Sequence, residues 1–500
     1  MLYWFLIIFL ATLLVKVLHH FIFGNYDYWK KRGVPYIQPK PFFGSLVEVA
    51  LGGAHPGKYI GQYYYKFNSP YFGFFAFKKP YLVITDPELI KTVLIRDFNS
   101  FANRHFVSDK KIDPVVSNGL FAIKNPVWRW LRQKLSPFLS LAKIKLMVPI
   151  IQECNDCLKD YINENVGKAV EVKEMSAKYA TDVIVKCSFG INSNSFKCED
   201  EFRLAGKALM GQSFMRSLKV FSYYYAPKLV KIFKFRFIES SAVEFIRNVF
   251  LETYRKREES GVNNQRLDLI NILIKMRNEG AEFDGFKLDE DNLVAQALTL
   301  FSSGFEAAAS TLAFTLHELA VNPDVQHKLR EEIRSVTATD KGLCFSDIQS
   351  MKYLDMAVSE TMRKFPAVSF IHRECLEDYK IPSTGLVIQK GTPILVGLYG
   401  LHYDERHFPD AQKYKPERFS DDNGSNITNC TYIPFGQGPR ACIGQMLGIL
   451  LVKMAVTEIL RNFSIERDST TVEPVLLTPF PIVQAKGGLP LRFKHLSVNF

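Results

Sequence analysis

The chain opens with an unbroken apolar run before its pattern becomes amphipathic. No charged residue occurs from Leu2 to Val15, and apolar character continues past Lys16 to Phe23. A run of this length, with Lys16 reaching back to the interface, is long enough to cross a bilayer of about 30 Å. The bulky and polar residues that end it are unlike a signal-peptidase site. We therefore expect a retained membrane anchor over residues 1–24.

A basic and proline-rich segment follows this run. The tryptophan and three basic residues over 29–32 indicate that the remaining chain lies on the cytosolic side of a membrane. Three prolines within residues 35–41 favour an extended backbone. We expect a linker over residues 25–45. Because no second linker and no repeat follow, we expect one domain over residues 46–500.

The pattern within this domain predicts mostly helices. Aromatic and β-branched residues on both sides of Lys78 and Pro80 predict a hairpin over 71–85. The longest predicted helix begins at the aspartates of 289–291 and ends before Asn322 and Pro323. The expected fold class is mainly α with a minor β-sheet, preceded by one N-terminal transmembrane helix. Further helices are expected at 323–335, 352–365 and 443–462, and short strands around 378–397 and 475–493.

Composition narrows the possible classes of protein. The 500 residues are 47% hydrophobic and 23% charged, which excludes a disordered or low-complexity chain. The net charge of +12 suits anionic lipid and an acidic protein partner. Eight cysteines are too few for a disulfide scaffold of this length, so we expect reduced thiols.

One cysteine stands in a glycine-rich loop directly before an apolar helix. This loop runs from Phe435 through two glycines and Arg440 to Cys442. A thiolate at a helix N-terminus is stabilised by the helix dipole, which predicts a lowered pKa and a role as metal ligand or nucleophile. The glycines allow the backbone to approach a flat partner, and Phe435 can cover it. A buried cysteine in a turn is the alternative that this loop alone leaves open.

The loop resembles the haem-thiolate loop of the cytochrome P450 superfamily, and other motifs of that family follow its order. Glu360 and Arg363 match its helical ExxR pair, and the segment 416–419 carries the arginine, Arg418, that closes a structural triad with them. The segments 101–104, 135–137 and 372–375 look most like insect microsomal enzymes of family six and their vertebrate family-three relatives.

The resemblance implies the cytochrome P450 fold and haem b as cofactor, with Cys442 as the axial ligand of the haem iron. Arginine suits the haem propionates because its planar fork stays charged when buried and binds a carboxylate with two N–H groups. The residues that the resemblance places on the haem are Arg104, Trp128, Arg132, Arg373, Phe435, Arg440 and Cys442.

The implied activity is the insertion of one oxygen atom from O2 into a lipophilic substrate. That substrate would be a xenobiotic such as an insecticide, or an endogenous hormone or lipid. Electrons would come from NADPH through the cytochrome reductase, with cytochrome b5 as an optional second donor. The implied location is the endoplasmic reticulum membrane, with the catalytic domain in the cytosol. We expect no nucleic-acid partner.

The segment that would deliver protons departs from the family pattern. The family carries an acidic residue followed by threonine on the long central helix, whereas Glu306 is followed here by Ala307. Ser303 lies one turn before Ala307 on the same face, so its hydroxyl or a substrate hydroxyl would replace the alcohol. Alternatively, Ser303 and Ala307 only shape the pocket. The predicted catalytic set is Glu306, Ala307 and Ser303.

The missing threonine keeps two other functions open. A hydroperoxide isomerase or dehydratase would need no NADPH, and a haem protein that only binds apolar ligands would need no proton delivery. The expected pocket residues are Phe301, Ala307, Phe370 and Phe480.

Two surfaces are predicted to meet other molecules. The aromatic and basic stretch 221–238 predicts either a patch that dips into the membrane near a substrate entrance or ordinary helix packing. The electron donor is expected to dock on the Cys442 side, near Arg129, Lys134, Lys143 and Lys145.

Overall fold

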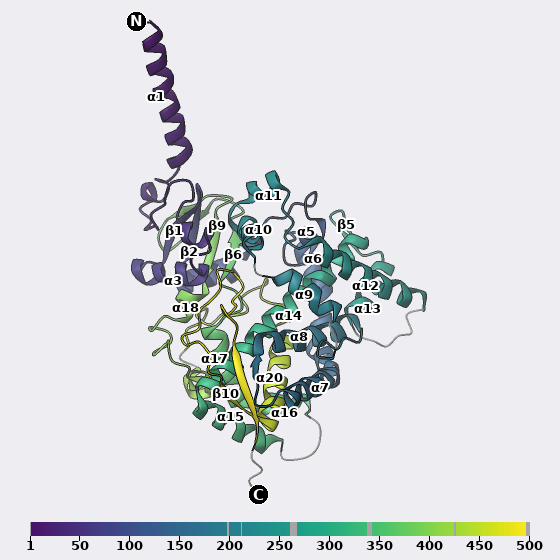
Figure 1. Cartoon of the computed structure of the whole chain (residues 1–500). Coiled ribbons are helices and arrows are strands. Elements are labelled where there is room, and N and C mark those ends of the chain that lie inside the picture. Colours follow the sequence, from purple (N-terminus) through teal and green to yellow (C-terminus); the bar gives the residue numbers. More distant parts are fainter. Residues whose placement is uncertain are drawn as a thin grey trace.

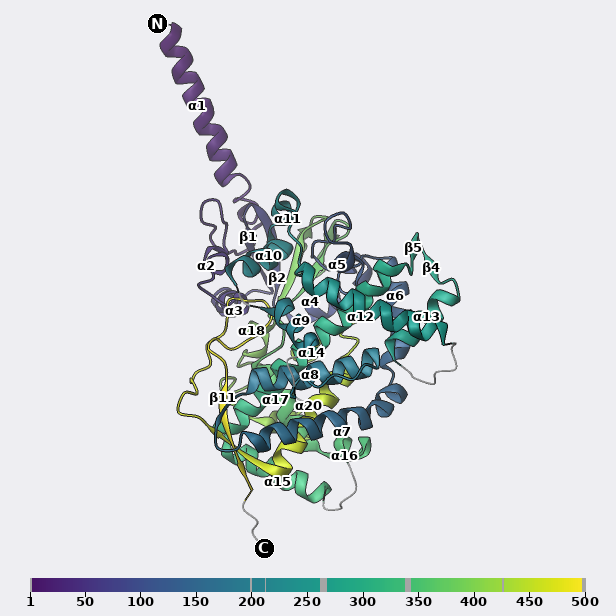
Figure 2. The same cartoon turned by 45° about the vertical axis from the view of Figure 1, so that its right-hand side comes forward.

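The N-terminal helix stands apart from the rest of the molecule. The computed structural model describes residues 2–197, 200–211, 213–260, 268–337, 343–424 and 427–496. Helix α1 (Leu2–Phe23) projects away from the body (Figures 1 and 2). Across these described ranges, no single helix combines the length and the apolar character of a membrane span. The apolar part of α1 covers Tyr3–Leu13, and one bent pair, Val127–Leu139 with Leu141–Glu164, passes on length and composition alone.

The proline-rich segment packs onto the body and does not act as a free spacer. Trp29 is only 2% exposed, and its indole fills the position that a side chain at Gly73 would take. The amide of Ile37 donates to the carbonyl of Gly73 (2.9 Å) and the amide of Gly73 to that of Pro35 (2.7 Å). These contacts explain the difference from the expected linker, because apolar residues of the segment gain burial against the sheet.

A four-stranded sheet lies beside this segment in the order β1-β2-β9-β6. Strands β1 (Tyr71–Ala76) and β2 (Lys79–Ile84) pair antiparallel, so the hairpin prediction is confirmed. Strand β9 (Pro393–Gly397) pairs parallel with β2 and antiparallel with β6 (Phe370–Glu374), a strand that the sequence pattern did not indicate.

The smaller sheets use short strands. Strand β10 (Phe463–Arg467) pairs with β11 (Pro490–His495), which pairs with β3 (Ala169–Glu171). Two-stranded pairs join β4 (Glu282–Phe283) to β5 (Phe286–Lys287) and β7 (Tyr379–Lys380) to β8 (Val387–Ile388).

Helices make up most of the body, as predicted. The predicted helices correspond to α14 (Glu290–Val321), α15 (Pro323–Val336), α17 (Lys352–Lys364) and α20 (Gln445–Asn462). The other α-helices are α2 (Val47–Ala50), α3 (Pro56–Phe67), α4 (Pro87–Lys91), α5 (Pro114–Asn118), α6 (Val127–Leu135), α7 (Leu141–Glu164), α8 (Val172–Phe189), α9 (Glu201–Met210), α10 (Phe214–Tyr225), α11 (Pro227–Phe233), α12 (Ser240–Glu259), α13 (Leu269–Asn278), α16 (Phe345–Ser350), α18 (Leu398–His402) and α19 (Asp421–Gly424). Short turns are η1 (Lys30–Arg32), η2 (Thr92–Arg96), η3 (Phe98–Phe101), η4 (Ser136–Leu139) and η5 (Pro416–Phe419).

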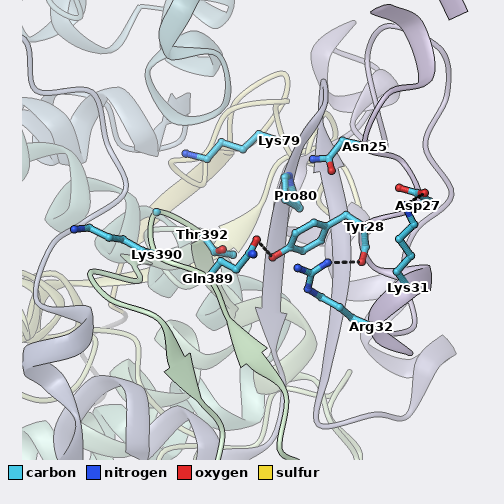
Figure 3. Close-up of a pocket in the computed structure, with 11 residues that line it drawn as sticks. Asn25, Asp27, Tyr28, Lys31, Arg32, Lys79, Pro80, Gln389, Lys390 and Thr392 are labelled. Atoms are coloured by element: carbon cyan, nitrogen blue, oxygen red, sulfur yellow. Dashed lines mark hydrogen bonds and ion pairs between the residues drawn. The ribbon is translucent and has the colours of Figure 1, made fainter. Parts of the chain in front are cut away.

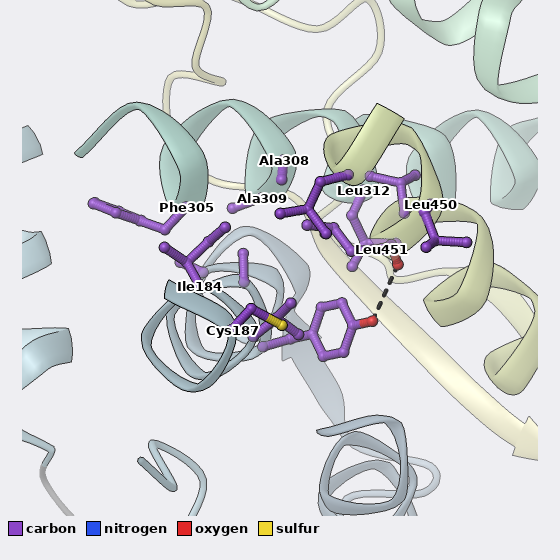
Figure 4. Packing of buried hydrophobic residues seen from close by; sticks show 14 of the residues in the cluster. Ile184, Cys187, Phe305, Ala308, Ala309, Leu312, Leu450 and Leu451 are labelled. Atoms are coloured by element: carbon purple, nitrogen blue, oxygen red, sulfur yellow. Dashed lines mark hydrogen bonds between the residues drawn. The ribbon is translucent and has the colours of Figure 1, made fainter. Parts of the chain in front are cut away.

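Helix α14 runs through the centre of the body. Its start is capped by Asp289, whose carboxylate accepts from the amide of Asn292 (2.8 Å), and Pro323 begins the next helix. Figure 4 shows α14 packed against α8 and α20 through small and aliphatic side chains. A Cβ at Gly304 would lie 2.9 Å from Ile184, so the glycine permits the close approach of α14 and α8. This packing fixes the central helix relative to the loop that precedes α20.

Candidate functional site

The loop before α20 is folded tightly around Cys442. Gly436 and Gly438 have φ values of 75° and 74°, which side chains rarely adopt. A Cβ at Gly438 would stand 2.0 Å from the carbonyl oxygen of Leu94, so only glycine fits there. The amide of Cys442 donates to the carbonyl of Phe435 (2.9 Å) and closes the loop. Cys442 keeps solvent-accessible surface, so it is not a fully buried turn cysteine.

The electrostatics of this thiol differ from the prediction. Helix α20 begins at Gln445, so Cys442 precedes its first turn. The amide of Gly444 and the charges of Arg104 and Arg132 each lower the pKa of Cys442. The protein atoms around the thiol nevertheless exclude enough water to raise its pKa, because desolvation is the largest effect. The expectation of a lowered pKa was therefore wrong for the protein alone, and a bound metal cation would have to displace the proton.

Four arginines from separate parts of the chain converge near the loop. Arg440 follows the glycines, Arg132 lies on α6, Arg373 on β6 and Arg104 after η3. Burial lowers the pKa of Arg440 to about 7, that of Arg373 to about 9 and that of Arg104 to about 10, and the neighbouring arginines contribute. Arg132 is close enough to lower the pKa of Arg440 as well.

Some N–H groups of these arginines lack hydrogen-bond acceptors within the protein. Arg440 donates to the carbonyls of Ala102 (2.6 Å) and Ile123 (3.0 Å), and its guanidinium lies 4.1 Å from the Trp128 ring centre. Its Nη1 and the Nε of Arg373 are buried without a hydrogen-bond acceptor. Within the described ranges, no carboxylate forms an ion pair with any of the four. Buried N–H groups and unbalanced charge are costly unless an anion binds.

This donor set fits the propionate edge of a haem. Two carboxylates on a flat ring would supply the missing acceptors and balance the arginine charges. The exposed Cys442 thiol offers a soft ligand for iron beside the same cluster. Phe435, which is half-buried, lies at the start of the loop that closes on Cys442. The residues predicted to contact haem therefore belong to one region of the fold.

The predicted structural triad is assembled behind the loop. Arg363 Nε and Nη2 donate to the two carboxylate oxygens of Glu360 at 2.7 and 2.8 Å, and both side chains are fully buried. Arg418 Nε donates to the same carboxylate at 3.2 Å. Arg363 also donates to the carbonyls of His402 and Ala411 (2.8 Å each). The triad thus holds η5 and the segment before it to α17.

On α14, the Glu306 carboxylate contacts other residues than Ser303 and Ala307, the two with which it was predicted to act. The carboxylate of Glu306 is 3% exposed, and its Oε1 lies 2.9 Å from Lys173 Nζ at the start of α8. Gln484 Nε2 donates to the same oxygen at 2.7 Å, and Ser310 at 3.4 Å. Sequence reasoning missed Lys173 and Gln484, because both lie far from the motif in the chain and carry no local pattern.

Ser303 and Ala307 lie on a different side of α14 from these contacts. Ser303 is exposed and its hydroxyl donates to the carbonyl of Thr299 (2.5 Å). Ala307 is half-buried and its carbonyl accepts from Thr311 (3.0 Å). The structure therefore brings Ser303 and Ala307 onto one face, and it holds Glu306 by a separate ion pair.

The predicted pocket residues occupy three different places. Phe301 is fully buried, with its ring centre 5.2 Å from Phe305 and 6.0 Å from Phe202. Phe370 on β6 is 5.0 Å from the ring of His372. Phe480 lines a cavity of about 350 Å³ between α2, α10 and residues 478–481. Phe301 thus packs within the core cluster.

His372 is a third polar residue whose role sequence reasoning missed. Its Nε2 is buried without a partner, and its ring stacks on Tyr224 at 4.7 Å. Burial, with Arg104 and Arg373 nearby, lowers the pKa of His372 to about 3, so it is neutral at physiological pH. Its position directly before Arg373 is the one sequence feature that could have drawn attention to it.

Comparison with known proteins agrees with this geometry. The sequence profile described as "Cytochrome P450" matches residues 34–491. The chain belongs to the cytochrome P450 family. Similar proteins are cytochrome P450 6k1 of Blattella germanica, 38% identical over 97% of this chain and 96% of that protein, and cytochrome P450 6l1 of the same species, 35% identical over 96% and 95%. The probable cytochrome P450 6g2 of Drosophila melanogaster is 36% identical over 94% of each chain.

The expected likeness to insect enzymes of family six is thereby confirmed. As a cytochrome P450 the protein is a haem-thiolate monooxygenase, an oxidoreductase with haem b as cofactor. Membership also implies a redox partner, O2 and a lipophilic substrate. The mainly helical fold with a minor sheet is the fold expected of this family.

Proposed function

We propose that this cytochrome P450 is a membrane-bound microsomal monooxygenase that oxidises a lipophilic xenobiotic, hormone or lipid with electrons from NADPH–cytochrome reductase. The observation that carries the proposal is the exposed Cys442 thiol beside four arginines that lack carboxylate partners. The location is the endoplasmic reticulum membrane, with the body on the cytosolic face and cytochrome b5 as an optional second electron donor.

The chain's own residues have separable roles in this activity. Cys442 holds the haem iron, and Arg104, Arg132, Arg373 and Arg440 hold the propionates. When bound, the haem supplies the reductive activation of O2, which a thiolate ligand favours by donating electron density. The Phe435–Cys442 loop fixes the position of Cys442, because its two glycines adopt positive φ values and the amide of Cys442 donates to the carbonyl of Phe435.

Proton delivery is the step in which this chain departs from its family. Ala307 has no hydroxyl, and the Glu306 carboxylate is shared by Lys173 and Gln484. These two contacts engage the carboxylate away from the face of α14 that Ser303 and Ala307 share. We therefore assign the proton-donating hydroxyl to Ser303 or to the substrate, and we expect part of the reduced oxygen to leave as peroxide.

Apolar surface near α1 supports membrane attachment and substrate entry from lipid. Tyr3 and Trp4 on α1 are 82% and 71% exposed. On α10 and α11, Phe214 is 72% exposed and Phe233 61%, whereas Tyr223 is buried by helix packing. The stretch 221–238 therefore supports both interpretations in part. Tyr223 packs inside the body, as in ordinary helix packing, whereas Phe233 at the end of α11 is exposed and could contact a membrane. Exposed aromatic residues on α1, α10 and α11 favour contact with a membrane.

The test is a reconstitution of the full chain with NADPH–cytochrome reductase in phospholipid membranes. We expect a reduced carbon monoxide spectrum with the thiolate-type red shift. We also expect oxygenated product from some of a panel of apolar compounds, with NADPH consumed in excess of product and the difference recovered as peroxide. Omitting the reductase is the control and should stop NADPH consumption. Product formation without reductase and NADPH would contradict the proposal.

The missing hydroxyl at Ala307 favours one second candidate, a hydroperoxide isomerase or dehydratase. Such an enzyme rearranges an oxygen–oxygen bond that its substrate already carries, and therefore needs neither electrons nor added protons. Rapid consumption of fatty-acid hydroperoxides without NADPH, together with no turnover of apolar compounds in its presence, would select this candidate.

A further inference from the structure

A basic cleft lies where the chain leaves α1 and enters the body. It has a volume of about 480 Å³ and lies between residues 25–32, the start of β2 and the 389–392 turn (Figure 3). Among its lining residues, Lys31, Arg32, Lys79 and Lys390 are cationic and Asp27 is acidic. The cleft therefore has an excess of positive charge.

The charge in the cleft is available for a ligand. Lys31 Nζ forms an ion pair with Asp27 at 2.5 Å, so the one acidic lining residue is neutralised by Lys31 and leaves the other three cations unbalanced. In the described part of the chain, no carboxylate forms an ion pair with Arg32, Lys79 or Lys390. Lys79 is half-buried and Lys390 exposed. Figure 3 shows the chains of both lysines extended beside the cleft without a contact to the other residues drawn.

The wall of the cleft is built from two segments far apart in sequence. Tyr28 is 8% exposed, and its hydroxyl donates to Gln389 Oε1 at 3.1 Å. The Arg32 guanidinium lies 3.7 Å from the centre of the Tyr28 ring and donates to the Tyr28 carbonyl at 3.2 Å. Asn25 Nδ2 donates to the carbonyl of Lys78 at 3.3 Å. These contacts hold Arg32 and the segment that carries it against the 389–392 turn before any ligand arrives.

The position of the cleft relative to α1 points to a membrane ligand. The 22 residues of α1 span about 33 Å at about 1.5 Å per residue, close to the hydrocarbon thickness of about 30 Å. When α1 crosses the membrane, Asn25 and Asp27 lie at the depth of the phospholipid headgroups. Phe42 and Phe43 are 54% and 41% exposed, and Phe43 lies 6.4 Å from Phe77 at the tip of the β1–β2 hairpin. An apolar rim for acyl chains therefore borders the hairpin that carries Lys79.

We propose that this cleft binds the anionic headgroup of a membrane phospholipid such as phosphatidylserine, with its phosphate and carboxylate between Lys79, Lys390 and Arg32. The proposal rests on the membrane attachment proposed above. A bound headgroup fixes the angle between α1 and the body, because it bridges the segment after α1 and the sheet. We assign the cleft to an anionic lipid and not to soluble phosphate, because the apolar rim and α1 place it at the bilayer surface.

The experiment uses the haem-loaded full chain in nanodiscs that contain spin-labelled phosphatidylserine or phosphatidylcholine. Electron paramagnetic resonance measures the fraction of each lipid immobilised by the protein. We expect preferential immobilisation of phosphatidylserine, which weakens as ionic strength rises. The double variant Lys79→Ala/Lys390→Ala should lose the preference. Each lysine removed should lower the affinity for phosphatidylserine relative to phosphatidylcholine about fivefold at low salt.

The matched control removes the same charge far from α1. Lys256 on α12 and Lys275 on α13 are highly exposed, with exposed side-chain fractions of 71% and 73%. The variant Lys256→Ala/Lys275→Ala should keep the lipid preference. An equal preference in the Lys79→Ala/Lys390→Ala variant, or no preference in the natural chain, would overturn the inference.

Two further arms separate the sources of failure. Inorganic phosphate or glycerophosphoserine at millimolar concentration should leave the phosphatidylserine preference largely intact. Complete displacement by inorganic phosphate would overturn the lipid assignment in favour of a soluble anion. If the chain fails to float with phosphatidylcholine vesicles, the proposed membrane attachment itself is wrong. If it floats but shows no lipid preference, only the headgroup site is wrong.

Discussion

The cysteine loop and the middle of α14 both carry buried polar or charged groups, but they differ in whether the protein itself supplies partners for those groups. The loop from Phe435 to Cys442 is one continuous segment whose hydrogen bonds close on itself, and its neighbours bring charge without acceptors. On α14, the Glu306 carboxylate is ion-paired with Lys173 and accepts a hydrogen bond from Gln484, two residues from other segments. The arginines around the cysteine loop thus keep N–H groups that a cofactor could bind. The Glu306 carboxylate on α14 is instead satisfied by partners within the protein.

The difference shows how burial affects charge in one protein. The arginines near Cys442 keep N–H groups without acceptors, a state that is unfavourable unless an anion completes it. Glu306 is ion-paired with Lys173 and accepts a hydrogen bond from Gln484, so its buried carboxylate has partners and α14 is tied to α8. A charged residue in a familiar motif therefore acts according to the partners that the fold brings to it.

The largest effect is expected from Cys442→Ser. A serine hydroxyl keeps its proton near neutral pH and gives no thiolate ligand, so the thiolate-type carbon monoxide band and all NADPH-dependent product should disappear. Cys344→Ser, at the other exposed cysteine of the described ranges, is the control and should leave both unchanged. A variant at 442 that retains the red-shifted band would contradict the assignment.

Removing one arginine of the cluster should weaken haem binding without abolishing it. Arg440→Met keeps the packing against Trp128 but removes a charged donor, and a charge-assisted hydrogen bond contributes about 1.5–3 kcal/mol. Haem should therefore transfer to an acceptor protein about 10 to 100 times faster. Lys134→Met, an exposed change on α6, should leave the transfer rate unaltered. A rate equal to that of the natural chain would argue against a propionate contact.

The same cluster predicts a pH dependence of the haem-depleted protein. The folded pKa values of about 7 for Arg440, 9 for Arg373 and 10 for Arg104 lie below the ordinary value of 12.5. Between these values the folded chain binds fewer protons than the unfolded chain, so the free energy of unfolding rises with pH. Urea unfolding from pH 7 to 10 should show increasing stability without haem. The slope should be smaller with haem bound; equal slopes would mean that the propionates do not balance this cluster.

A double-mutant cycle tests the ion pair on the other side of the comparison. Lys173→Met leaves Glu306 as a buried unpaired carboxylate and should lower the free energy of unfolding by about 3 kcal/mol. The double variant Lys173→Met/Glu306→Leu should recover most of this loss, because both charges are then absent. The exposed pair Lys256–Glu252 provides a control and should contribute less than about 1 kcal/mol. Additive losses in the cycle would mean that the two side chains do not stabilise each other.

The smallest effect is expected from Ala307→Thr. A hydroxyl at this position can hold a proton-donating water on the face that Ser303 already occupies. Peroxide released per NADPH should fall several-fold, and Ser303→Ala should raise it. Ser302→Thr adds a methyl group next to Ser303 and five residues before Ala307; as the control it should leave peroxide release unchanged. Unchanged peroxide in both the Ala307 and Ser303 variants would show that neither position delivers protons.

Much of the framework follows from local sequence. Asp289 and Pro323 define the ends of α14 because capping and the missing proline amide act within one turn. The β1–β2 hairpin and the cysteine loop follow from turn residues and glycine spacing for the same reason. The carboxylate–guanidinium pair of Glu360 and Arg363 lies within one helical turn, so its contact is also local.

What the sequence by itself determined is therefore the set of elements, the thiol loop and the family. Tertiary structure alone decided that Lys173 and Gln484 contact the Glu306 carboxylate and that Trp29 packs over Gly73. It also decided that Lys79 and Lys390 line the same cleft. These contacts join segments far apart in the chain, and no local spacing specifies them. Their strength also depends on how much water the packed body excludes. The position of Cys442 is set by its own loop, whereas the partners of Glu306 come from segments far apart in the chain.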